Sequence, residues 1–250
     1  MGGGRIGQVW VPYCGAAPSP DELLARWNFD PLMLVALGGA ALAWHLTIYR
    51  REQARLAPFL AGMAALAVLF VSPFCAMTSA LFAARTAHHA LLVAVAAPLL
   101  AWSFPERSLW RKLPVGAWTG IGAAVLWAWH VPALYAAALS HDLVYWLMQA
   151  SLLASAIAFW SAVRQSAVPA AVAALLANMV QMGLLGAILT FASAPLYAPH
   201  LLSTTAWGYT PLEDQQLGGL VMWAPAAALY LAAALLIAGR WLGEKSRTPA

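Results

Sequence analysis

Long apolar segments alternate with short polar connectors along almost the whole chain. An α-helix of about 20 apolar residues crosses the hydrocarbon core of a bilayer, and these segments lack the alternation that marks the strands of a membrane barrel. The pattern predicts an all-α integral membrane protein with seven transmembrane helices, at Pro31–Tyr49, Ala57–Pro73, Thr86–Trp102, Gly116–Val131, Leu143–Val163, Pro169–Phe191 and Leu217–Arg240. Residues 1–30 then precede a helical domain of residues 31–240, and residues 241–250 form a tail.

Charged residues fall mainly in the connectors, and their sign alternates from one connector to the next. One set of connectors holds 10 of the 13 basic residues: Arg50, Arg51, Arg55, Arg107, Arg111, Lys112, Arg164, Arg240, Lys245 and Arg247. The other set holds six of the nine acids: Asp21, Glu22, Asp30, Asp142, Glu213 and Asp214. Because cytoplasmic loops are enriched in lysine and arginine, we expect the N-terminus outside and the C-terminus in the cytoplasm.

The composition agrees with a membrane protein and excludes several other classes. Hydrophobic residues make up 63% of the chain and charged residues 9%, whereas a soluble domain carries about 25% charged residues. The net charge of +4 follows the topology, so it predicts no nucleic-acid partner. Residues 1–20 lack the apolar core of a signal peptide. Motifs typical of nucleotide binding or hydrolysis are missing from the sequence, and we expect no enzyme.

Prolines predict where several helices end or bend. Pro98 and Pro225 fall inside predicted spans and should kink them, because proline removes a backbone donor and clashes one turn back. Pro132 should end the fourth span just after His130, leaving Ala133–Leu139 as a short connector on the outer side. The connector Ala192–Gln216 is too long for a simple turn, and its aromatic residues favour an ordered lid.

Residues with metal-binding chemistry gather on the predicted outer side. Five of the six histidines lie there: His88, His89, His130, His141 and His200. Both cysteines, Cys14 and Cys75, lie there too, and Met77 follows Cys75 closely. Imidazole together with soft sulfur ligands suits Cu(I). We therefore predict a copper site formed by His89, His130 and His141 and completed by Met77, Met222 or Cys75.

Each of these residues also has a simpler structural interpretation. A single histidine in a membrane helix usually bonds to a neighbouring helix, and a methionine usually fills a gap in packing. Two cysteines in an oxidising compartment more often form a disulfide than a metal site, so a Cys14–Cys75 disulfide stands beside the thiol-ligand hypothesis.

Further polar residues are expected to support the site. Asp214 precedes the last span, where an acid either complements the helix dipole or orients imidazole ligands. Arg85 lies four residues before His89, on the same helical face. It is expected to pair with Asp142 or Asp214, or to bind an anionic lipid or ligand. His88, His200 and Cys14 complete this supporting group.

Several strings, taken in order, resemble one family of membrane proteins. They are Ala84-Arg-Thr-Ala-His-His-Ala-Leu-Leu92, Ala97-Pro-Leu-Leu100, Trp129-His-Val-Pro-Ala-Leu-Tyr135, Phe159-Trp160, Ala194-Pro-Leu-Tyr197 and Pro211-Leu-Glu-Asp-Gln-Gln-Leu-Gly-Gly-Leu-Val-Met-Trp223. From about Asp30 to Arg240 the chain is similar to the CtaG family of seven-helix proteins, which are assembly factors for caa(3)-type cytochrome c oxidases. The resemblance matches His89, His130, Asp214 and Met222 to family positions.

The resemblance implies help in forming the copper centres of the oxidase, with Cu(I) held or passed on the outer face of a bacterial plasma membrane. The implied partners are oxidase subunits, periplasmic copper chaperones and the lipid bilayer. The chain departs from the family at two places. Family members often have His-Met where this chain has Arg85 and Thr86, and many carry a further histidine near Gln149. Two other functions remain open: a metal-free scaffold that docks oxidase subunits, and a membrane oxidoreductase that binds b-haem or quinone, with His89 and His130 as axial haem ligands.

Overall fold

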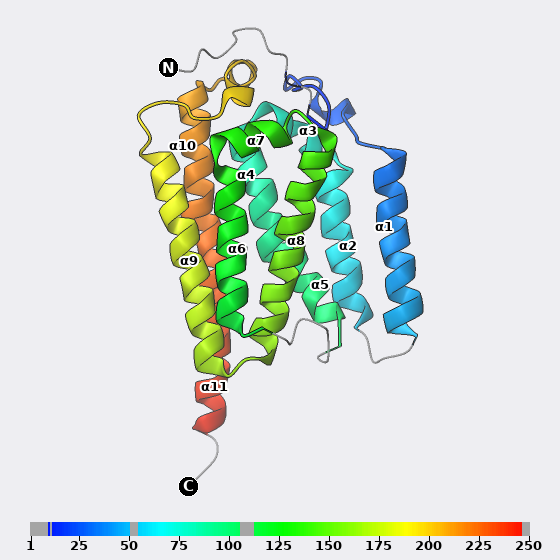
Figure 1. Cartoon of the computed structure of the whole chain (residues 1–250), viewed down its shortest axis with the longest axis vertical. Helices are drawn as coiled ribbons and strands as arrows, with labels where there is room; N and C mark the ends of the chain where they lie inside the picture. The colour runs from blue at the N-terminus through cyan, green and yellow to red at the C-terminus, as the bar shows by residue number, and fades with distance from the viewer. Residues whose placement is uncertain (1–9, 11, 51–54, 106–112, 247–250) are drawn as a thin grey trace.

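The structure is a computed structural model that describes residues 10, 12–50, 55–105 and 113–246. Regular structure in these residues is helical throughout. The α-helices are α1 (Pro31–Trp44), α2 (Leu56–Phe70), α3 (Pro73–Ala80), α4 (Phe82–Leu91), α5 (Ala97–Ser103), α6 (Val115–His130), α7 (Pro132–Ala138), α8 (Asp142–Gln165), α9 (Val168–Thr190), α10 (Pro211–Val221) and α11 (Ala227–Lys245). Most of them run along the long axis of one bundle (Figure 1).

Among the described residues, five helical runs are long and apolar enough to cross a membrane: Pro31–Tyr49, Phe82–Ser103, Asp142–Gln165, Val168–Thr190 and Pro211–Lys245. Two further pairs pass the same test but are bent, by 48° between α2 and α3 and by 79° between α6 and α7. The number of candidate spans is therefore five, or up to seven if each bent pair is one span. The final helix continues to Lys245, beyond the expected boundary at residue 240.

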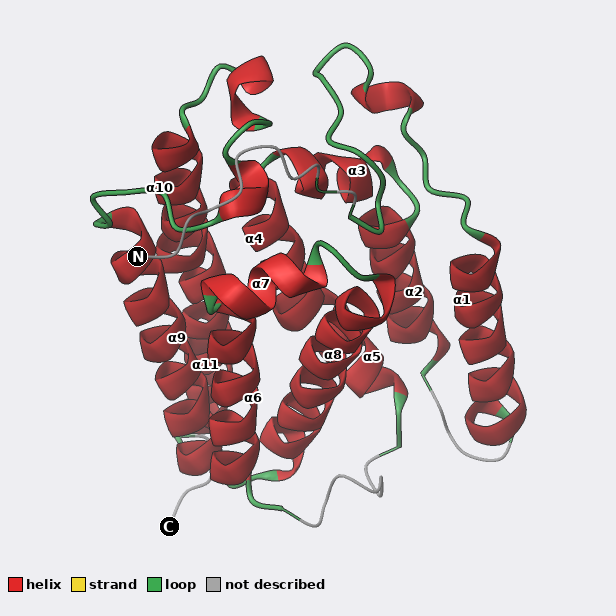
Figure 2. Ribbon diagram, turned by 45° about the horizontal axis from the view of Figure 1, so that its top comes forward, coloured by secondary structure: helices red, strands yellow, loops and turns green. Residues whose placement is uncertain are grey.

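Two predicted connectors are helical. The segment expected between the second and third spans contains α3 and the first turn of α4. The expected connector Ala133–Leu139 is mostly α7, which lies across the end of the bundle above α6 and α8 (Figure 2). Pro132 is the first residue of α7, where its missing N–H costs nothing and its fixed φ favours a helix. The proline therefore ends one helix and begins the next.

Both prolines predicted to kink spans lie beside π-helical turns. Pro225 lies inside the π segment Met222–Ala226, between α10 and α11. Pro98 is the second residue of α5, two positions after the π segment Leu92–Ala96. A widened turn leaves room for the proline ring and tolerates the loss of its backbone N–H donor.

The helices differ sharply in how far they are buried. α4 lies in the middle of the bundle, and 61% of its span is buried (Figure 1). α1 stands at the periphery beside α2, with 11% of its span buried (Figure 2). The remaining surface of α1 is apolar, as expected for a helix that faces lipid. The centre of the bundle is therefore built around α4.

The bundle has two distinct ends, which we name by their residues. The disulfide end carries Cys14 and Cys75, α7 and the connector 191–210. The C-terminal end carries the last turn of α8, which includes Arg164, and the last turns of α11 (Figure 1). The predicted lid is ordered: Tyr197, His200 and Thr204 are buried within it. Its last residues, from Pro211 onward, belong to α10.

Candidate functional site

The central helix α4 begins at a carboxylate donated by another helix. The two oxygens of Asp214, on α10, accept hydrogen bonds from the backbone N–H groups of Phe82 (2.6 Å) and Ala83 (3.1 Å). These N–H groups have no partner inside α4, and the positive end of the helix dipole favours the negative charge. The start of α10 is capped separately by Thr210 and Glu213. Asp214 therefore holds α4 in place, rather than capping its own helix.

Three histidine rings lie next to one another in the core of the disulfide end. The rings of His88 and His89 on α4 have centroids 5.9 Å apart, and those of His89 and His130 are 6.1 Å apart. All three side chains are buried. His130 is the last residue of α6, so the end of that helix brings its ring to α4.

The hydrogen bonds of these rings leave specific nitrogens unused. His88 Nε2 lies 3.1 Å from the carbonyl of Leu69, and His130 Nδ1 lies 2.7 Å from the carbonyl of Leu126. Because a carbonyl only accepts, each of these nitrogens carries the proton, and the other ring nitrogen holds a lone pair. His88 Nδ1 and both nitrogens of His89 have no hydrogen-bond partner among the described residues.

His200 and two tyrosines close the site from the lid. His200 Nε2 lies 2.6 Å from the hydroxyl of Tyr135, and its Nδ1 lies 3.4 Å from the carbonyl of Ala80. Tyr197 donates to the carbonyl of His130 at 3.0 Å. Burial, together with the positive charge of nearby Arg85, lowers the pKa of His200 to about 3. His200 is therefore neutral and serves to dock the lid.

Arg85 is buried one turn before His89 without a charged partner. It is 1% exposed, and none of its guanidinium nitrogens has a hydrogen-bond partner among the described residues. Its guanidinium carbon lies 5.4 Å from the centre of the Tyr145 ring. Asp214 is held by backbone amides, and Asp142 is exposed at the start of α8. Neither expected acid partner is bonded to Arg85.

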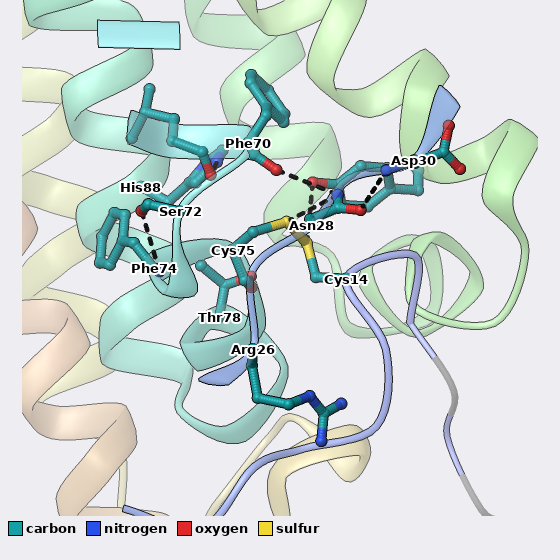
Figure 3. Close-up of a disulfide and its surroundings, with 12 residues drawn as sticks. Cys14, Arg26, Asn28, Asp30, Phe70, Ser72, Phe74, Cys75, Thr78 and His88 are labelled. Atoms are coloured by element: carbon teal, nitrogen blue, oxygen red, sulfur yellow. Dashed lines mark hydrogen bonds between the residues drawn. A yellow bond between two sulfur atoms is a disulfide. The ribbon is translucent and has the colours of Figure 1, made fainter. Parts of the chain in front are cut away.

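The disulfide expected between Cys14 and Cys75 is present, with the two Cα atoms 5.5 Å apart. It ties the segment before α1 to α3 (Figure 3). Asn28, in the same segment, donates to the carbonyl of Phe70 at 3.1 Å. The hypothesis of Cys75 as a thiolate ligand is wrong for this structure, because the sulfur is bonded to Cys14. The disulfide instead braces α3, which leads directly into α4.

The other candidate ligands lie apart from the three histidines or at their edge. His141 is exposed at the start of α8, so it does not join the buried group. Met77 packs with Ala80, Leu81 and Ala84 in a small separate cluster. Met222 is buried against α9, where its Cβ lies 3.2 Å from the position that a Cβ on Gly186 would take.

Met222 also lies towards α4. Gly218, one turn before it on α10, packs closely against Phe82 and Thr86. Residues four apart share a helical face, so Met222 lies on the side of its helix that meets α4. It remains a candidate ligand.

The sequence prediction missed several polar residues of this site. Tyr135 lies inside the quoted Trp-His string but was not singled out there, and Tyr145 and Gln149 lie one turn apart on α8. A tyrosine and a glutamine at helical spacing within an apolar span were the available signal, because buried polar groups in a membrane need partners. Arg85 and Gln149 both lie beside Tyr145 and so adjoin this site.

No group of three or more histidine, cysteine, aspartate or glutamate side chains within the described residues has the arrangement of a metal site. The arrangement is a pair of imidazoles, His89 and His130, with His88 beside them. The fold and this site define the protein as a polytopic helical membrane protein with a polar interior near one end, stabilised by a disulfide.

Comparison with known proteins identifies its family. Residues 38–122 and 117–244 match the family described as cytochrome c oxidase caa3 assembly factor (CtaG). The match covers most of the chain, and the protein belongs to this family. No curated protein and no solved structure matches the chain.

Proposed function

We propose that this assembly factor holds Cu(I) between His89 and His130 and delivers it to the copper centres of a caa3-type cytochrome c oxidase. The observation that carries the proposal is the buried pair of imidazoles, 6.1 Å apart, with unused ring nitrogens on both. A buried polar atom without a partner is costly, and a soft metal ion would supply that partner.

The donor atoms suit the ion. Metal-bound histidines usually donate their second N–H to a carbonyl or carboxylate, as His130 does to Leu126. Imidazole nitrogens lie about 2 Å from a first-row metal, so two rings on opposite sides of one ion have centroids about 6 Å apart. The ring separation of 6.1 Å agrees with that arrangement. His88 Nδ1 and the Met222 sulfur are candidates for a third ligand.

The proposal places seven spans in a bacterial plasma membrane, with the disulfide end outside. Basic connector residues at the C-terminal end, including Arg164 and Arg240, favour the cytoplasm for that end. A disulfide persists in an oxidising compartment, which supports the opposite end being outside. Copper would then be received and released on the face where periplasmic copper chaperones operate.

The decisive experiment measures Cu(I) bound per chain in detergent-purified protein under reducing conditions. We expect about one copper in the wild type and loss of it in His89→Ala and His130→Ala. His141→Ala is the matched control, because His141 is exposed and should keep the metal. Unchanged copper in both site variants, with normal gel-filtration profiles, would overturn the proposal. A Soret band in the same preparation would instead support a haem protein.

A metal-free scaffold is the second candidate, and one observation favours it. A groove of about 460 Å³ opens at the disulfide end between the N-terminal segment and the lid, lined among others by Trp10, Glu22, Pro199 and Leu202. It could seat a segment of an oxidase subunit. Normal oxidase assembly in cells that carry His89→Ala and His130→Ala would favour this function over copper delivery.

A further inference from the structure

Arg85 is the one basic residue among the fully buried side chains of the described structure. Burying a guanidinium is costly unless it is paired and hydrogen-bonded. Arg164, near the C-terminal end, meets this need by donating to the carbonyls of Ala101 and Phe104. Arg85 has no such acceptor among the described residues. The guanidinium therefore requires a hydrogen-bond acceptor that the described residues do not supply.

The side chains around Arg85 are mostly hydrogen-bond donors or neutral groups. The ring of Tyr145 lies under the guanidinium. The hydroxyl of Tyr135 donates to His200 Nε2, because His200 Nδ1 carries its proton towards the carbonyl of Ala80. Gln149, one turn from Tyr145 on α8, is 2% exposed, and both of its amide atoms lack a partner among the described residues. The only acid in the buried part of the described chain, Asp214, is bonded to Phe82 and Ala83.

This combination selects an anion. A fixed positive charge repels a second cation, while the amide of Gln149 and the hydroxyl of Tyr145 offer directed donors. The planar fork of arginine matches the two oxygens of a carboxylate. Since Arg85 is 1% exposed, a lipid headgroup cannot reach it without opening the bundle, so the ligand must be small and free.

We propose that Arg85 and Gln149, with the hydroxyl of Tyr145, bind one small carboxylate ion beside His89. Arg85 and His89 lie four residues apart on α4, on one helical face. A bound carboxylate would then offset the repulsion between the guanidinium and a copper ion on His89. This second step rests on the proposed function: the bound carboxylate would raise the affinity of His89 and His130 for copper.

The carboxylate site is tested first without copper. Thermal unfolding of the metal-free, detergent-purified protein is measured while sodium acetate replaces the bulky sulfonate MES at constant ionic strength and pH. A ligand of the folded state stabilises it by mass action, and we expect a saturable rise in Tm of about 3–5 °C. Chloride and vesicles containing phosphatidylglycerol are the comparison arms. An equal response to chloride, a response to the lipid alone, or no response to acetate would each overturn the proposal.

Variants assign the response to residues. Arg85→Gln should abolish the acetate response, and Gln149→Leu, which keeps the charge, should weaken it. Arg240→Gln is the matched control, because Arg240 is an exposed arginine on another helix. Persistence of the full response in Arg85→Gln contradicts the assignment, and Gln149→Leu provides the same test if Arg85→Gln does not fold.

Measurements of Cu(I) binding then test the coupling between the carboxylate site and the copper site. Binding is reciprocal between linked sites, so acetate should raise the Cu(I) affinity of the wild type, measured by competition with a chromophoric chelator. Arg85→Gln should bind Cu(I) more tightly than the wild type in acetate-free medium and should not respond to acetate. An arginine that binds no carboxylate would leave the Cu(I) affinity of the wild type independent of acetate, so the acetate response is the discriminating result. If copper does not bind at all while acetate still stabilises the metal-free protein, the proposed function fails and the carboxylate site stands.

Discussion

Asp214 and His200 show how single side chains hold the site together. Asp214 reaches from α10 to the first two amides of α4. His200 reaches from the lid to Tyr135 on α7 and to the carbonyl of Ala80 on α3. Both contacts join segments far apart in the sequence. These residues position the site and do not themselves offer free donor atoms to a metal.

The neutral state of His200 predicts a pH dependence of stability. Its pKa is about 3 in the folded protein and about 6.5 in an unfolded chain. Between these values the unfolded state binds a proton that the folded state does not, so stability falls as the pH drops below about 6.5. The contribution approaches about 1.4 kcal/mol per pH unit, or about 3–6 °C in Tm per pH unit.

Melting curves between pH 7.5 and 5 measure this effect in wild type and in His200→Gln. Glutamine is expected to keep a hydrogen bond to Tyr135 but carries no titratable group. Its Tm should therefore fall less steeply with pH than that of the wild type. Parallel curves for the two proteins would show that His200 is not the group responsible.

At the scale of elements, small residues set the distance between α9 and α10. A Cβ on Gly219 would lie 2.6 Å from the carbonyl of Gly186 and would also meet Thr190. A Cβ on Gly186 would lie 2.7 Å from the carbonyl of Gly219. In lipid there is no hydrophobic driving force for helices to associate, so their close van der Waals packing stabilises the contact instead. The pair also fixes the position of Met222, one turn further along.

Gly219→Ala should therefore lower stability, by about 1–3 kcal/mol as for other overpacked sites. Gly243→Ala is the matched control on α11, because a Cβ there meets no atom within 4 Å. Alanine is the better helix former by up to about 1 kcal/mol, so this variant should be unchanged or more stable. Thermal unfolding in detergent compares the two variants. Equal effects would mean that the α9–α10 contact does not depend on glycine.

The whole molecule depends on its disulfide end, where the N-terminal segment, α3, α7 and the lid meet above α4. The Cys14–Cys75 bridge closes a sequence separation of 61 residues. In the chain-entropy description a loop of this size contributes about 4 kcal/mol. The segment before α1 also contacts the helices through Tyr13, whose ring lies 5.0 Å from that of Tyr145, and through Asn28, which donates to the carbonyl of Phe70.

The double variant Cys14→Ser/Cys75→Ser should therefore unfold at a Tm lower by about 10 °C and expose the N-terminal segment to protease. It should still bind Cu(I), because neither sulfur is free to be a ligand in this structure. The copper content of the folded double variant is measured below its Tm and compared with that of the wild type. Loss of copper from a folded double variant would restore the hypothesis of Cys75 as a ligand.

The length and apolar character of the spans are local properties, and each predicted span falls on one of the five long helical runs or the two bent helix pairs of the structure. The sequence also indicated the disulfide, beside the alternative of a thiol ligand, and predicted the ordered lid and the grouping of histidines near one end. Family membership followed from the order of short strings. Each of these features depends on residues close together in the chain, or on the simple alternation of connectors between two ends.

Which side chains meet inside the bundle was decided only by the tertiary structure. Helices that are apolar on all sides carry no amphipathic face to fix their rotation or their neighbours. The sequence grouped His89 with His130 and His141, but it could not predict that His141 stays exposed outside this group, or that Asp214 caps α4. Nor could it predict that Arg85 is left without an acid. These contacts depend on the bend at Pro132, the close approach of α4 to Gly218 and the path of the lid, which bring distant segments together.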